Sequence, residues 1–123
     1  MVAPRARAFF ADQIDPGWKL AQDRMGQFMA SKFYENDPQG TALRKDWAEL
    51  SNQMELAESM VVNAYSGIGE RTSATNSVRQ ALTRVLNLLR NYTGAEQVTH
   101  YLRGLDFRLS PGTLQRGLSE QAT

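Results

Sequence analysis

The chain has 123 residues, with 14 Lys and Arg, 13 Asp and Glu, one His and no Cys, and its length fits one domain with a sizeable core. Hydrophobic residues at 41% and charged residues at 22% are typical of a globular protein and exclude a disordered chain. The missing cysteines exclude disulfides, thiolate metal sites and a cysteine nucleophile.

Targeting signals are weak. No apolar stretch approaches the roughly 20 residues of a membrane span, so no membrane partner is expected. The N-terminal sequence MVAPRARAFFAD has only a short apolar patch, too short for a signal peptide, although its arginines leave a transit peptide open. The sequence therefore predicts a soluble protein, cytoplasmic or particle-associated, and leaves the compartment unknown.

Residues 1–15 are predicted to form an N-terminal arm. Two adjacent aromatic residues, Phe9 and Phe10, lie on it next to Arg5 and Arg7. Such a pair either inserts into a neighbouring subunit or packs back on the chain's own core. Phe9 and Phe10 are therefore candidate self-association residues.

The first helix is predicted from Pro16 to about Tyr34. Asp15 and Pro16 form an N-cap followed by proline at the first helical position, and residues 36–38 read as a stop signal, because a residue before proline leaves the helical region. Apolar residues at spacings of three and four form one face of this helix: Trp18, Ala21, Met25 and Phe28.

The second helix is predicted from Asp37-Pro38 to about Ser66, with Gly67 in the positive-φ position that ends many helices. Its apolar residues alternate spacings of four and three, a heptad pattern typical of helix packing: Leu43, Trp47, Leu50, Met54, Ala57, Val61, Ala64 and Ile68.

A third helix is predicted to begin near Ser77, or earlier at Ser73 or Thr75. A capping box over residues 93–96 predicts the start of a fourth helix, and residues 106–109 are expected to be extended. Ser110-Pro111 then predicts a helix of one or two turns. The expected fold is an all-α bundle of about four helices over residues 16–109, with a C-terminal appendage over 110–123.

Charge is unevenly distributed along the chain. Residues 8–70 carry five basic and ten acidic residues, whereas residues 71–123 carry seven arginines and three acidic residues. An acidic front half and a basic back half indicate something about partners rather than about fold.

The polar face of the third helix carries no acidic residue. It is either a solvated face, a surface for an acidic protein partner, or a nucleic-acid surface in which arginines contact phosphates. The candidate partner-binding or nucleic-acid-binding residues are Arg71, Arg79, Arg84, Asn87 and Arg90. The matching acidic candidates for self-association are Asp46, Glu49, Glu55 and Glu58 of the second helix.

Catalytic groups are few. His100 lies four residues after Glu96, half of a metal site at best, and the acidic pair Glu55 and Glu58 reads as solvated charge. No catalytic residue, metal or cofactor is therefore expected, nor a small-molecule substrate.

The sequence favours a non-enzymatic assembly or adaptor subunit that self-associates or docks on other proteins, such as a structural component of a virus or phage particle or of a secretion-type machine. Complementary charge on one chain permits head-to-tail contacts. The alternative is a small nucleic-acid-binding protein that uses the arginines of the third helix.

Overall fold

The computed structural model describes residues 2–32 and 37–120, and within these ranges the protein is an all-α bundle, as predicted. Seven helical elements follow one another along the chain: α1 (Pro4–Phe9), the π-helical turn η1 (Phe10–Ile14), α2 (Asp15–Lys32), α3 (Pro38–Val62), α4 (Ile68–Leu89), α5 (Glu96–Arg108) and α6 (Pro111–Glu120).

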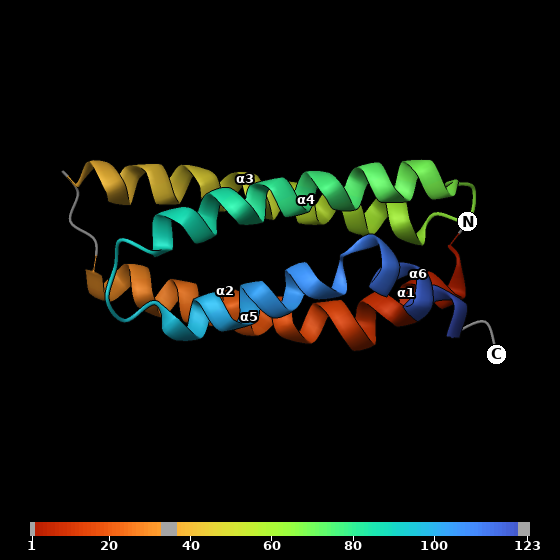
Figure 1. The fold of residues 1–123 in the computed structure, drawn as a ribbon, viewed down its shortest axis with the longest axis horizontal. Coiled ribbons are helices and arrows are strands. Elements are labelled where there is room, and N and C mark those ends of the chain that lie inside the picture. Colours follow the sequence, from red (N-terminus) through yellow and green to blue (C-terminus); the bar gives the residue numbers. More distant parts are fainter. Residues whose placement is uncertain (1, 33–36, 121–123) are drawn as a thin grey trace.

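The four long helices form two layers (Figure 1). One layer is the antiparallel pair α3 and α4, and the other is the pair α2 and α5. The short helices α1 and α6 contact each other at the end of the bundle where both chain termini lie. The chain thus runs up, down, up and down through the four long helices.

The predicted start of the first helix at Asp15 is wrong. Helical backbone begins at Pro4 and continues through η1 into α2, so Asp15 lies inside a helix with φ −59° and ψ −41°. The segment predicted as an arm therefore packs into the bundle as a helix. The predicted end of this helix at Tyr34, and Asn36 of its stop signal, lie outside the described residues.

The spacing of the apolar residues in this segment explains the π-helical turn. Ala6, Phe10, Ile14 and Trp18 recur every four residues, and the first three are buried. A regular α-helix turns about 40° too far at each such step. A π turn holds an extra residue, so it keeps this stripe facing the core.

The boundary between α3 and α4 also differs from the prediction. The Asp37 cap of α3 is confirmed, because Asp37 Oδ1 accepts a hydrogen bond from the Gln39 amide at 3.0 Å. The helix ends at Val62 rather than Ser66, however, and Gly67 has φ −83°. Gly67 is the N-cap of α4, which begins well before Ser77, and the Glu70 carboxylate accepts a hydrogen bond from the Gly67 amide at 3.4 Å.

The connection between α4 and α5 turns at Gly94, which has φ 91°. The N-cap of α5 is Ala95 rather than Thr93, and Glu96 Oε1 accepts a hydrogen bond from the Gly94 amide at 3.3 Å. The prediction of extended backbone over 106–109 is wrong, because α5 continues to Arg108 with Leu105 and Leu109 buried on one face.

The heptad pattern of α3 lies in the core of the bundle. Leu43, Leu50, Met54, Ala57 and Val61 are all buried, so this part of the pattern is used within the chain. The predicted continuation through Ala64 and Ile68 is wrong, because α3 ends at Val62 and both residues are exposed. Next to it the rings of Trp18 and Trp47 pack with centroids 5.1 Å apart and link α2 to α3.

The end of the bundle near the termini is closed by hydrogen bonds to the last carbonyl groups of α3. The Ala3 amide donates to Val62 O at 2.6 Å. Arg71 donates from Nε to Val61 O and from Nη2 to Asn63 O, both at 2.9 Å. These bonds satisfy carbonyl groups that a helix end otherwise leaves unpaired.

Candidate functional site

A surface groove of about 640 Å³ runs between α2 and α5. Two exposed apolar side chains flank it, Leu20 from α2 at 42% exposure and Phe107 from α5 at 62%. Gly17 and Gly104 also line it, so its walls include two positions without a side chain. A groove with small residues and apolar flanks suits an amphipathic helix laid along it.

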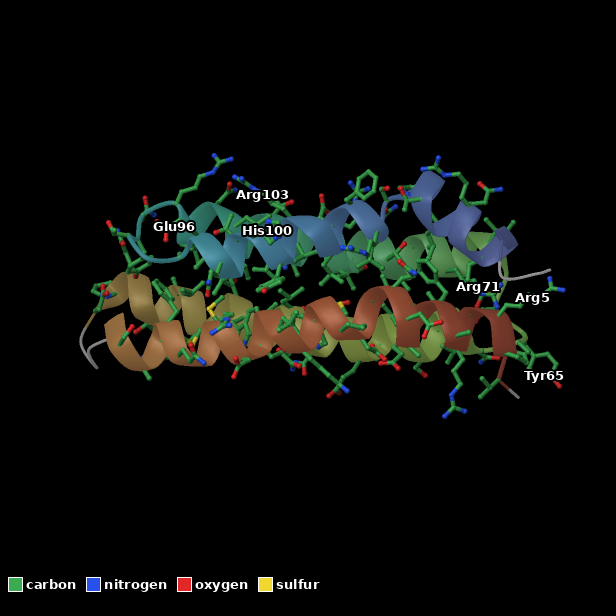
Figure 2. The ribbon with its side chains drawn as sticks, turned by 90° about the horizontal axis from the view of Figure 1, so that it is seen from below. Arg5, Tyr65, Arg71, Glu96, His100 and Arg103 are labelled. Carbon is green, nitrogen blue, oxygen red and sulfur yellow. The ribbon has the colours of Figure 1, made fainter. Side chains whose placement is uncertain are left out.

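Cations predominate in this groove. Arg103 and Arg108 of α5 line it together with His100, and Asp12 is the acidic residue in its lining. Figure 2 shows His100 and Arg103 on α5, close to one another along the helix. The groove is therefore apolar at its edges and positive along α5, and it favours an acidic, amphipathic partner.

The outer surface of α3 has the complementary character. The side chain of Leu56 is 63% exposed, whereas the apolar residues on the opposite side of α3 are buried. We call its surroundings the Leu56 ridge, which consists of Glu49, Asn52, Glu55, Leu56 and Ser59, all exposed. Residues 49–60 contain three acidic residues and no basic one.

The groove and the Leu56 ridge belong to different layers of the bundle, since α3 lies in one layer and α2 and α5 form the other (Figure 1). One copy of the chain therefore presents two different surfaces of complementary charge. In general, contact between two different surfaces of identical subunits is heterologous.

The predicted arginine face is only partly available. Arg71 is bound to the carbonyl groups at the end of α3, and Arg79 Nε pairs with Asp106 Oδ1 of α5 at 2.9 Å. The remaining candidates are exposed, Arg84 and Asn87 on α4 and Arg90 at its C-cap. The structure thus leaves three of the five predicted residues as an open polar surface.

The predicted self-association residues also separate into groups. Phe9 and Phe10 are 2% and 1% exposed. Of the two predicted alternatives, they therefore pack on the chain's own core rather than standing free to insert into a neighbouring subunit. On α3, Glu49 precedes Glu58 by nine residues, two and a half turns, which places the two carboxylates on opposite flanks. Asp46 is half-buried, and only Glu49 and Glu55 belong to the Leu56 ridge.

A pair of carboxyl groups that the sequence did not bring together lies where α2 meets α3. Burial raises the pKa of Glu58 above its ordinary value of 4.5, the nearby charge of Asp15 raises it further, and Arg7 opposes the shift. Burial likewise raises the pKa of Asp15, and Lys19 opposes that shift. This cluster is mixed in charge, so it is not an acidic docking surface.

The groups considered for catalysis make other contacts in the structure. His100 is exposed and packs edge-on against Tyr101 with ring centroids 5.5 Å apart, and the Glu96 carboxylate binds the Gly94 amide. Within residues 2–32 and 37–120 no cluster of three or more metal-ligating side chains is present.

In this described part of the chain, no helix has both the length and the hydropathy needed to cross a bilayer.

The fold and these surfaces place the protein in the broad class of all-α helical bundles. Comparisons with known proteins do not narrow this class, because no family model, no curated protein and no solved structure matches the chain.

Three residues that matter for these surfaces were not singled out from the sequence: Leu20, Leu56 and Phe107. Each is a large apolar residue outside the buried stripe of its helix. The sequence could have identified them. Once the core-facing side of a helix is assigned, an apolar residue on its other side must be exposed to solvent in the single chain.

Proposed function

We propose that this protein is a helical assembly subunit, in which the Leu56 ridge of one copy docks into the groove between α2 and α5 of the next. The observation that carries the proposal is the match between the two surfaces. Leu56 is exposed among Glu49 and Glu55 on the ridge, and the groove offers apolar flanks beside two arginines.

Both parts of this match contribute to association. Burying Leu56 between Leu20 and Phe107 removes apolar surface from water, while the arginines of α5 approach the acidic side chains of the ridge and fix the direction of docking. A contact of one ridge in one groove is small. We therefore expect an affinity on the order of micromolar, typical of small interfaces.

Leu56→Glu tests the ridge. The residue is exposed in the single chain, so folding should be unchanged, but a carboxylate buried between apolar side chains should weaken association tenfold or more. The measurement is light scattering coupled to size exclusion over the micromolar range. Tyr65→Glu is the matched control, since Tyr65 is exposed at 78% and lies outside both surfaces.

A groove variant supplies the second half of the test. Phe107→Glu should also yield monomers. If either variant associates as well as the unaltered chain does, or if the unaltered chain is monomeric throughout the micromolar range, the proposed docking is wrong.

Nucleic-acid binding is the second candidate, because Arg84, Asn87 and Arg90 are exposed in the last turns and at the C-cap of α4. In that case association would require an oligonucleotide, weaken steeply as salt increases, and disappear in Arg84→Ala/Arg90→Ala. Docking through the Leu56 ridge would instead proceed without an oligonucleotide and respond to Leu56→Glu.

A further inference from the structure

A second groove, of about 360 Å³, lies at the end of the bundle where the termini meet. It is formed by three elements that are far apart in the sequence, α1, the first turns of α4, and α6. Its volume is at the lower end of the range for small-molecule sites, roughly 300–1,000 Å³. It is separate from the groove between α2 and α5, since the two share no lining residue.

The lining of this end groove is amphipathic. One wall is apolar and consists of Ile68, Pro111, Leu114 and Leu118. Ile68 is 73% exposed, so a large apolar side chain stands at the edge of the groove with most of its surface in water. An apolar ligand would cover that surface.

The cationic groups of the end groove are two guanidinium groups, those of Arg5 and Arg71. Figure 2 shows Arg5 and Arg71 at the same end of the molecule, and both line the end groove. The groove lining contains no carboxylate. Among the side chains that the structure describes, none places a carboxylate within ion-pair distance of Arg5.

Arg71 is held in place for such a role. Its Nε and Nη2 donate to Val61 O and Asn63 O, so the plane of the guanidinium group is fixed before any ligand arrives. Its Nε and Nη2 are thereby bound within the chain, and the N–H groups of Nη1 are the donors that point a fixed guanidinium group at a carboxylate. A preorganised group loses less entropy on binding. Arg5 is exposed and reaches the groove from α1.

From this arrangement we propose that the end groove binds a small amphiphilic carboxylate, a short fatty-acid anion. The carboxylate contacts Arg5 and Arg71, and the apolar chain lies along Ile68, Leu114 and Leu118. The proposal does not depend on self-association, because none of these residues belongs to the Leu56 ridge or to the groove between α2 and α5.

The test compares three probes with the same apolar chain, namely octanoate, 1-octanol and octylammonium, each titrated calorimetrically and by amide chemical shifts. We expect saturable, one-to-one binding of octanoate, weaker binding of the alcohol and none of the cation, with shifts at Ile68, Thr72 and Leu114. Equal binding of octanoate and 1-octanol, or no saturable binding of octanoate, would overturn the proposal.

Two pairs of variants locate the site. Arg5→Ala should weaken octanoate binding about tenfold, the effect of one charge-assisted hydrogen bond, whereas Arg116→Ala removes an exposed arginine of α6 outside the groove and should not. Ile68→Asp places a carboxylate in the groove, and Tyr65→Asp adds the same charge outside its lining. If octanoate binds Ile68→Asp as tightly as it binds Tyr65→Asp, the ligand lies elsewhere and the assignment is wrong.

Discussion

The role assigned to Arg71 from the sequence differs from the contacts that it makes in the structure. The sequence places it in a basic region and makes it a candidate for partner contact. In the structure two of its nitrogen atoms bind the final carbonyl groups of α3 at 2.9 Å, and the α3–α4 connection is built around it. Its main energetic role is therefore in folding.

Arg71→Ala should lower the free energy of unfolding by about 2 kcal/mol, the scale for hydrogen bonds from a charged donor. Arg71→Lys should not restore it, because an ammonium group lacks the planar arrangement of donors. Urea unfolding followed by circular dichroism measures the change. Arg84→Ala, an exposed arginine of α4, is the control and should lie within about 0.5 kcal/mol of the unaltered chain. Equal stability of Arg71→Ala and Arg84→Ala would contradict this role.

Glu58 has the opposite effect on stability. Its pKa is raised in the folded state by burial and by the charge of Asp15, so the unfolded chain releases this proton more readily. The destabilisation is absent below the ordinary pKa of 4.5 and grows as the pH rises from there through the raised pKa of the folded state.

Glu58→Gln should consequently raise the melting temperature at neutral pH and flatten the loss of stability between mildly acidic and neutral pH. Glu55→Gln removes the same charge three residues away and is the control. Melting curves at several pH values measure both, and an identical pH dependence in the two variants would show that the raised pKa of Glu58 has no effect on stability.

At the scale of the element, α6 depends on one close approach. A Cβ atom at Gly117 would lie 2.6 Å from Phe9 Cδ2 and overlap the ring, and Phe9 is buried. Gly117 therefore lets α6 pack directly against α1.

Gly117→Ala should destabilise the docked form of α6 by about 1–3 kcal/mol, the usual cost of overpacking. Trypsin should then cleave faster at Arg116, which lies on the same helix. Gly112→Ala is the matched control, since a Cβ there meets nothing within 4 Å. The double variant Gly117→Ala/Phe9→Leu should recover part of the loss. Equal cleavage of Gly117→Ala and Gly112→Ala would contradict this packing.

The helices themselves were largely predictable from the sequence, and their ends were not. The apolar stripe of α3 and the Asp37 cap predicted that helix well, because periodicity and capping are local properties. The start at Pro4 was missed because three successive spacings of four do not fit a regular helix. Gly67 was placed at the wrong helix end because only the geometry of the connection separates an N-cap from a C-cap.

The candidate surfaces were less predictable than the helices. The sequence identified excess acidic charge in the first half and excess basic charge in the second, and both proposed surfaces retain that character. It did not show which charges are neutralised within the chain, such as Arg79 by Asp106, or that α2 and α5 border a common groove. Both depend on contacts between residues far apart in the sequence.

At the scale of the whole molecule, two different complementary surfaces give a prediction that identical surfaces would not. Leu56→Glu blocks the ridge and leaves the groove intact, whereas Phe107→Glu blocks the groove and leaves the ridge intact. Each variant alone should be monomeric. An equimolar mixture should form one-to-one dimers that grow no further, because each dimer has only blocked surfaces left. Light scattering of the mixture measures this, and a mixture that stays monomeric would contradict heterologous docking.

The π-helical turn over Phe10–Ile14 also affects how the chain tolerates a change in its length at this point. A single-residue insertion in a helix is absorbed without rotating either flanking segment when the extra residue enters a π turn. Here the residues between Phe10 and Ile14 are exposed, and deleting Gln13 would reduce the spacing of those two from four to three, as a regular helix allows. The deleted chain should fold with the same core. The turn thus lets chains that differ by one residue at this point keep one architecture.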